Sequence, residues 1–231
     1  MDRNRGEPSQ RVTLSSEDEP GIIDLTTHQT PFQEGAPAWG RYVAAIRNEL
    51  SHRQNISGIT GTISTTLPIG AGLSSSAALM VAVAVALGFE GSAIELAQLA
   101  RRAEVAATGV PTGIMDQLCI ASATSGHATQ IDCNDLTIDH VRIPDDVKIA
   151  IRFITHRTLE GSAYATRVSE CSKAESEIGP LRLAHLVDID GINDLTVRSR
   201  ARHVISENER VRTFAQDRKS TRLNSSHQII S

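Results

Sequence analysis

The sequence predicts a mixed α+β fold, because both strand-like and helix-like patterns occur along its 231 residues. From residue 58 to 67, apolar or small residues alternate with serine and threonine, which is the period of a half-buried strand. The apolar block from Ala77 to Leu87 has no polar face and stops at Gly88, which is typical of a buried helix. Alternation returns at 137–143 and 147–153, so two further strands are expected there.

The remaining helices are predicted from apolar spacing and from signals at their ends. Ser92 and Glu95 form a capping box that opens one helix, and Gly109 marks its expected end, with a proline shortly after. The other predicted helices cover residues 38–52, 161–178 and 194–215.

Composition excludes several classes of protein. Hydrophobic residues make up 40% and charged residues 22%, which suits a globular chain. A net charge of −4 argues against binding to nucleic acid or to a membrane surface. The polar N-terminus and the lack of a long apolar run predict neither a signal peptide nor a membrane span. Three cysteines without metal-type spacing fit a reducing compartment, so a cytoplasmic protein is expected.

The stretch from Leu67 to Ala78 joins the predicted strand to the buried helix through two glycines and three serines. A strand, a glycine loop and a helix N-terminus together suit a phosphate, because the first-turn N–H groups lack internal partners and glycines allow close approach. The loop has no Walker lysine, and Ser75 replaces the third glycine of a dinucleotide loop. The alternative is a serine-capped core helix after a tight turn.

The pattern P-x-x-x-G-L-S-S-S-A-A in this loop resembles the signature of the GHMP kinases. A second segment, Ala103-Glu104 followed by G-V-P-T-G-I-M-D-Q at 109–117, is similar to a segment of the galactokinases. Residues 156–164 and 200–210 resemble two later galactokinase regions in the same order. The chain is therefore identified as part of a galactokinase-like member of the GHMP kinases.

The resemblance implies a particular fold and domain organisation. Residues 21–155 are expected to form part of an N-terminal ATP-binding domain of the ribosomal protein S5 domain 2-like type. Residues 156–216 are expected to begin a ferredoxin-like α+β C-terminal domain. Residues 1–20 are expected to be disordered, and 217–231 to be a non-native or disordered tail. The family's N-terminal sugar signature and its later glycine-rich motif are absent, so we expect a truncated and inactive fragment.

The resemblance also implies the roles of individual residues, with ATP and Mg²⁺ as cofactors. Ser76 and Glu104 match the metal ligands, and Asp116 matches the catalytic aspartate, which accepts or orients the proton of the sugar hydroxyl. Gly113, Asp116 and Tyr164 match positions that contact the sugar. The phosphates are expected on Gly70, Ala71, Gly72, Leu73, Ser74, Ser75 and Ser76.

Each of these residues also has a purely structural interpretation. Ser76 would then cap a helix, and Glu104 would be a solvated helix carboxylate. Asp116 would bond to a turn, and Tyr164 would pack against Val168.

Two positions depart from the family pattern near the expected sugar site. Thr112 replaces a usual cysteine and Thr158 a usual serine, which leaves the exact sugar open. The function implied is a sugar 1-kinase that acts on small molecules, galactose first and arabinose or N-acetylgalactosamine as alternatives. A non-catalytic sensor of sugar and ATP is the second class of function, and the oligomeric state is not readable from the sequence.

Overall fold

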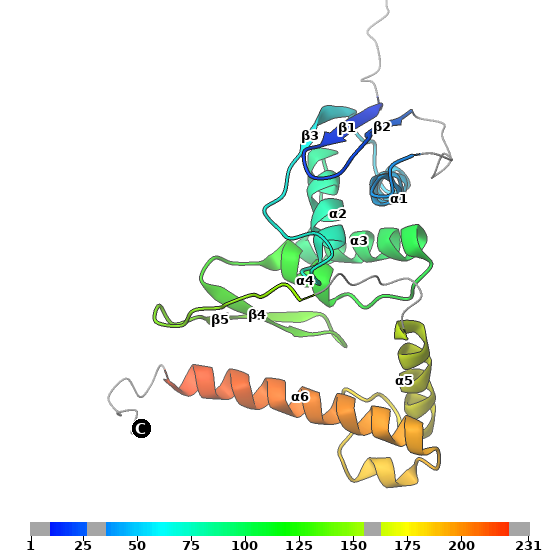
Figure 1. The fold of residues 1–231 in the computed structure, drawn as a ribbon. Coiled ribbons are helices and arrows are strands. Elements are labelled where there is room, and N and C mark those ends of the chain that lie inside the picture. Colours follow the sequence, from blue (N-terminus) through cyan, green and yellow to red (C-terminus); the bar gives the residue numbers. More distant parts are fainter. Residues whose placement is uncertain (1–9, 27–35, 155–162, 222–231) are drawn as a thin grey trace, which may run out of the picture. The chain divides into compact units, whose positions relative to one another are not determined.

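The computed structural model describes residues 10–26, 36–154 and 163–221 (Figure 1). The chain divides into two compact units. The first contains residues 1–122 and 151–160, and the second contains residues 123–150 and 161–231. Each unit is described by itself below.

The first unit contains a three-stranded sheet with the order β2-β1-β3. Strand β1 (Val12–Ser16) pairs antiparallel with β2 (Ile22–Leu25) and parallel with β3 (Ile59–Ile63). Helix α1 (Gly40–Ser51) lies between β2 and β3 in the chain (Figure 1), within the long connection that the parallel pairing requires. The expectation of disorder over residues 1–20 is wrong for β1, because this strand is hydrogen-bonded on both edges and buries Val12 and Leu14.

Strand β3 is shorter than the predicted strand at 58–67. Its last residue, Ile63, lies opposite Ser16, the last residue of β1, so no strand faces the residues that follow. Their N–H groups bond to side chains instead. The N–H of Thr65 donates to Asp18 Oδ2 over 2.8 Å, and the N–H of Leu67 donates to the Thr65 hydroxyl over 3.0 Å.

Three further helices complete the first unit: α2 (Ser75–Ala86), α3 (Ala93–Thr108) and α4 (Met115–Ser122). The core forms where these helices and α1 meet the sheet. Its largest fully buried apolar side chains in this unit are Val12, Val43, Ile46, Leu50, Met80, Leu87, Leu99 and Leu118. The prediction that the helix at 77–87 is buried on every face is wrong, since Val85 on α2 is 58% exposed.

The predicted ends of α3 are confirmed. The Ser92 hydroxyl accepts a hydrogen bond from the N–H of Glu95, and the Glu95 carboxylate accepts one from the N–H of Ser92 over 2.8 Å. At the other end Gly109 has a φ of 68°, a left-handed conformation that glycine adopts without strain.

The second unit contains a hairpin and two long helices. Strand β4 (His127–Asp132) pairs antiparallel with β5 (Thr137–Arg142), and β4 was not predicted. Helix α5 (Tyr164–Ile178) and helix α6 (Leu195–Thr221) flank a short 3₁₀ helix, η1 (Asp188–Gly191). Helix α6 runs into the predicted tail at 217–231, because no glycine or proline interrupts residues 195–221, and residues 222–231 lie outside the described part.

The strand predicted at 147–153 is wrong. Residues 148–154 form neither helix nor strand, and the side chains of Ile149 and Ile151 are 71% and 65% exposed. An alternating pattern becomes a strand only when a neighbouring backbone accepts its hydrogen bonds, and no described strand pairs with this segment.

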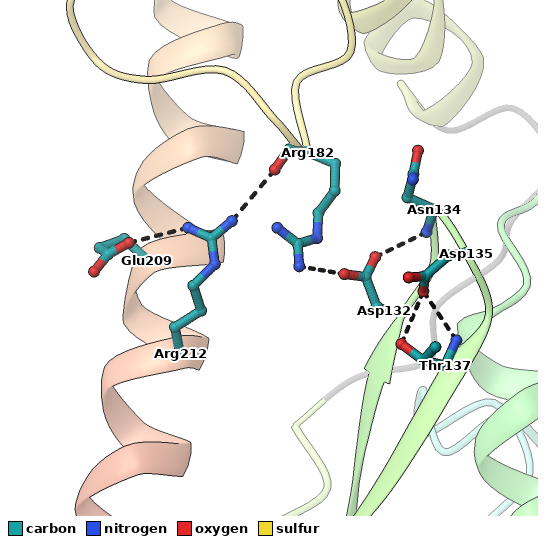
Figure 2. A network of polar contacts seen from close by, with 7 residues as sticks. All are labelled: Asp132, Asn134, Asp135, Thr137, Arg182, Glu209 and Arg212. Carbon is teal, nitrogen blue, oxygen red and sulfur yellow. Dashed lines mark hydrogen bonds and ion pairs between the residues drawn. The ribbon is translucent and has the colours of Figure 1, made fainter.

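A polar network joins the end of the hairpin to α6 within the second unit (Figure 2). The Arg182 guanidinium pairs with Asp132, whose other oxygen accepts the N–H of Asn134 over 3.0 Å. Arg212 on α6 donates to the carbonyl oxygen of Arg182 over 3.3 Å and to Glu209 over 3.0 Å. The hydrogen bond from Arg182 is the largest of the effects that lower the pKa of Asp132.

The capping box predicts a pH dependence of stability. Hydrogen bonds from the Ser92 N–H, Arg53 and the Ser92 hydroxyl lower the pKa of Glu95 from 4.5 to about 2. Because the folded pKa is the lower one, this stabilisation is present above about pH 4.5 and is lost as the pH falls towards 2. We expect Glu95→Gln to unfold below the melting temperature of the parent chain at pH 6, with a gap that closes on acidification. A gap that stayed constant from pH 6 to pH 3 in thermal unfolding would contradict this assignment.

Candidate functional site

The loop between β3 and α2 has an unusual backbone. Gly70 and Gly72 have φ values of 74° and 77°, and Ser74 has a φ of 59°. Three left-handed residues at alternate positions give the chain a tight, repeated bend, and glycine meets this demand at the first two without a steric cost. A side chain at position 72 would be strained, so the backbone itself forms the surface of the loop.

The start of α2 lacks the cap expected of an ordinary serine. Ser74 occupies the N-cap position, but its side chain makes no capping hydrogen bond. In this respect the structure differs from the alternative of a serine-capped core helix. The first N–H groups of α2 therefore point out of the helix without that partner, and they carry the positive end of the helix dipole.

The carboxylate of Glu104 is buried next to the start of α2. Glu104 on α3 is only 7% exposed, so the interpretation as a solvated helix carboxylate is wrong. The Ser76 hydroxyl on α2 donates to Glu104 Oε1 over 2.7 Å. The amide of Gln117 on α4 donates to Glu104 Oε2 over 2.8 Å, and Gln117 is itself fully buried. A carboxylate in such a position needs both donors to offset the loss of water.

Ser76 and Glu104 fit the requirements of a magnesium site. The hydroxyl hydrogen of Ser76 is directed to Glu104, so the lone pairs of its oxygen remain available to a cation. Mg²⁺ in proteins takes one or two protein oxygens and fills its other positions with phosphate and water. Among the described residues, no group of three or more His, Cys, Asp or Glu side chains is placed to hold a metal ion.

Asp116 lies just after the loop that follows α3, as predicted, and belongs to the first turn of α4. A carboxylate is favoured there by the helix dipole. Its side chain is half-buried, and the described residues provide it with no hydrogen bond or ion pair, unlike the alternative of an aspartate bonded to a turn. It is the sequence neighbour of Gln117, so α4 carries both the predicted base and a donor to Glu104.

The loop from 109 to 114 contains an orphaned polar atom. Arg101 on α3 donates to the carbonyl oxygen of Thr112 over 2.8 Å, which fixes the loop against the helix. Thr112 is 7% exposed, and its hydroxyl finds no hydrogen-bond partner among the residues that the structure describes. Gly113 next to it is exposed, as a sugar-contacting backbone position would be.

The structure brings several predicted residues together within the first unit. The glycine loop adjoins the Ser76–Glu104 pair, and Asp116 is adjacent to Gln117 in sequence. Tyr164 is the first residue of α5 in the second unit, and Thr158 lies outside the described residues. No described helix is both long and apolar enough to cross a membrane.

Gln117 and Arg101 are the polar residues to which sequence reasoning gave no role. Gln117 is the last residue of the motif at 109–117, and only its apolar sequence neighbours, Ile114 and Leu118, indicate that an amide here is buried. No sequence signal identifies Arg101 as the donor to the Thr112 carbonyl, because that contact spans the turn after α3.

Comparison with known proteins identifies relatives of this chain. Residues 41–124 match the family described as GHMP kinases N terminal domain. The chain is 34% identical to a galactokinase from Bos taurus over 86% of its length, and 39% identical to one from Roseiflexus sp. over 75%. These alignments cover 54% and 48% of the relatives, so the chain spans about half the length of the curated relatives it matches.

A solved structure of a galactokinase is also similar to this chain. The galactokinase of Lactococcus lactis, in complex with galactose, superposes with a TM-score of 0.78 at 27% identity. The match covers 95% of this chain and 62% of that one, and it confirms the predicted mixed α+β fold.

Two threonines, one at the end of α3 and one in the loop after it, predict opposite responses to the same substitution. Thr112→Val replaces an unpartnered buried hydroxyl by a methyl group of the same shape, so we expect stability to stay equal or to rise. Thr108 donates to the carbonyl oxygen of Glu104 over 2.8 Å and accepts the N–H of Val110 over 3.1 Å. Thr108→Val should therefore cost about 1–2 kcal/mol in urea unfolding. Equal losses in both variants would show that the Thr112 hydroxyl has a partner.

Proposed function

We propose, from the premise that this chain belongs to the GHMP kinases and is similar to galactokinases, that it serves as a sugar 1-kinase. The reaction is transfer of the γ-phosphate of ATP to the anomeric hydroxyl of galactose. The comparisons support this choice of sugar, because a solved relative that matches 95% of the chain was obtained with galactose. The cytoplasm, where ATP is plentiful, is the proposed location.

One observation supports the proposal most strongly. The glycine loop leads directly into a helix whose second residue, Ser76, is bonded to a buried carboxylate 28 positions later, Glu104. An anion at the N–H groups of α2 and a cation at the oxygens of this pair would therefore be neighbours. A nucleotide triphosphate with its divalent metal has that distribution of charge.

The mechanism assigns each step to residues of this chain. The N–H groups from Gly70 to Ser76 hold and orient the phosphates, and the helix dipole favours their negative charge. Ser76 and Glu104 would hold Mg²⁺, which supplies charge neutralisation when it is bound. Asp116 accepts or orients the proton of the sugar hydroxyl while the oxygen attacks the γ-phosphorus and the bond to the ADP oxygen breaks.

Gly72→Val should abolish nucleotide binding to the 231-residue chain. A β-branched residue is strained at a φ of 77°, and its side chain would occupy the surface that the phosphates approach. Calorimetry with ATP and Mg²⁺ measures the effect. Gly61→Val is the matched control, because Gly61 lies in β3 with open space around its added side chain. Unchanged affinity in folded Gly72→Val would exclude this loop as the phosphate site.

Asp116→Asn should lower turnover by about 10²–10⁴-fold while sugar binding persists, because the amide keeps the shape and loses the proton acceptor. The assay is ADP release with galactose, arabinose or N-acetylgalactosamine, on a chimaera in which this chain replaces the matching part of a complete galactokinase. Cys119→Ser, at an exposed position on the same helix, is the control. Near-parental turnover in Asp116→Asn would contradict the assignment of the base.

A further inference from the structure

We propose that Gln117 is a positioning residue for the metal site: its amide holds the Glu104 carboxylate in the orientation in which it binds a divalent cation. This inference rests on the proposed function, because it takes Glu104 to be a metal ligand. It adds a residue on α4 to a site otherwise built from α2 and α3.

The two oxygens of the Glu104 carboxylate accept hydrogen bonds from two different helices, α2 and α4. Glu104 Oε1 accepts the Ser76 hydroxyl over 2.7 Å, and Glu104 Oε2 accepts the Gln117 amide over 2.8 Å. Neither donor alone fixes the plane of the carboxylate, since one hydrogen bond leaves it free to turn about that contact. Two donors, one to each oxygen, fix the plane of the carboxylate, and each oxygen retains a lone pair for a cation.

The donor that Gln117 supplies is a neutral amide. A neutral amide donates a hydrogen bond without bringing a positive charge, so it orients the carboxylate without competing with a cation for it. An arginine or lysine at position 117 would also donate, but it would compete with the metal for the carboxylate. Groups that hold and orient a metal ligand in this way typically change metal affinity about 10–100-fold when they are removed.

Packing alone does not explain a glutamine at position 117. Gln117 is completely buried, and no described residue forms a hydrogen bond with its carbonyl oxygen Oε1. A buried amide with an unsatisfied oxygen costs stability compared with an apolar residue of similar volume, such as methionine or leucine. The contact that compensates is the one to Glu104.

The position of Gln117 in the chain couples it to the proposed base. It directly follows Asp116 in the first half of the eight-residue helix α4. A shift of α4 would therefore move the proposed base and the donor to Glu104 together. The amide contact adds a polar link to the packing between the helix that carries the base and the helix that carries the metal ligand.

The test compares nucleotide binding with and without metal, using Gln117→Met and Gln117→Leu in the full 231-residue chain. The probe is the non-hydrolysable analogue adenosine 5′-(β,γ-imido)triphosphate, titrated by calorimetry in EDTA and in Mn²⁺. We expect both variants to lose about 10–100-fold in the Mn²⁺-dependent affinity and to keep the affinity measured in EDTA. Leu118→Met, the neighbouring buried position on α4, is the control and should match the parent in both conditions.

The outcomes separate this inference from the proposed function. A parent chain that binds better with Mn²⁺, together with Gln117 variants that do the same, would overturn the inference and leave the proposed function standing. Equal losses in EDTA and in Mn²⁺ would also overturn it, because a purely structural residue acts on both. A parent chain whose nucleotide binding does not respond to Mn²⁺ would overturn the metal role of Glu104, and the role of Gln117 with it.

Discussion

The arrangement of the first unit depends on the two hydrogen bonds that the buried Glu104 carboxylate accepts. Glu104 accepts one hydrogen bond from α2 and one from α4 while it belongs to α3, so three helices meet at a single charged group. A carboxylate that is 7% exposed persists only where its donors are fixed. The same requirement fixes the start of α2, and with it the end of the glycine loop.

The first unit contains several features that are unfavourable for its stability. Ser74 has a left-handed backbone without a capping bond, and the polar atoms Thr112 Oγ1 and Gln117 Oε1 are buried without partners. Such features cost of order 1–3 kcal/mol each and tend to gather at functional sites. Burial of the apolar core around Ile46, Met80 and Leu99 on α1, α2 and α3 offsets their cost.

Local signals predicted the elements that depend on local physics. The capping box at Ser92 and the glycine end at Gly109 were found because each is completed by residues within a few positions. Strand β1 was missed, and the strand at 147–153 was wrongly predicted, for the opposite reason. A strand needs a distant segment to pair with, and an alternating pattern does not show whether that partner is present.

The sequence by itself determined the mixed α+β class, the glycine loop before a helix, and the residues that resemble a kinase site. Those features are written in composition, in spacing and in short motifs. Only the tertiary structure decided that Glu104 is buried and that Ser76 and Gln117 both bond to it, from 28 and 13 positions away. The physical reason is that the cost of burying a charge depends on donors brought by other helices, and their packing decides which donors arrive.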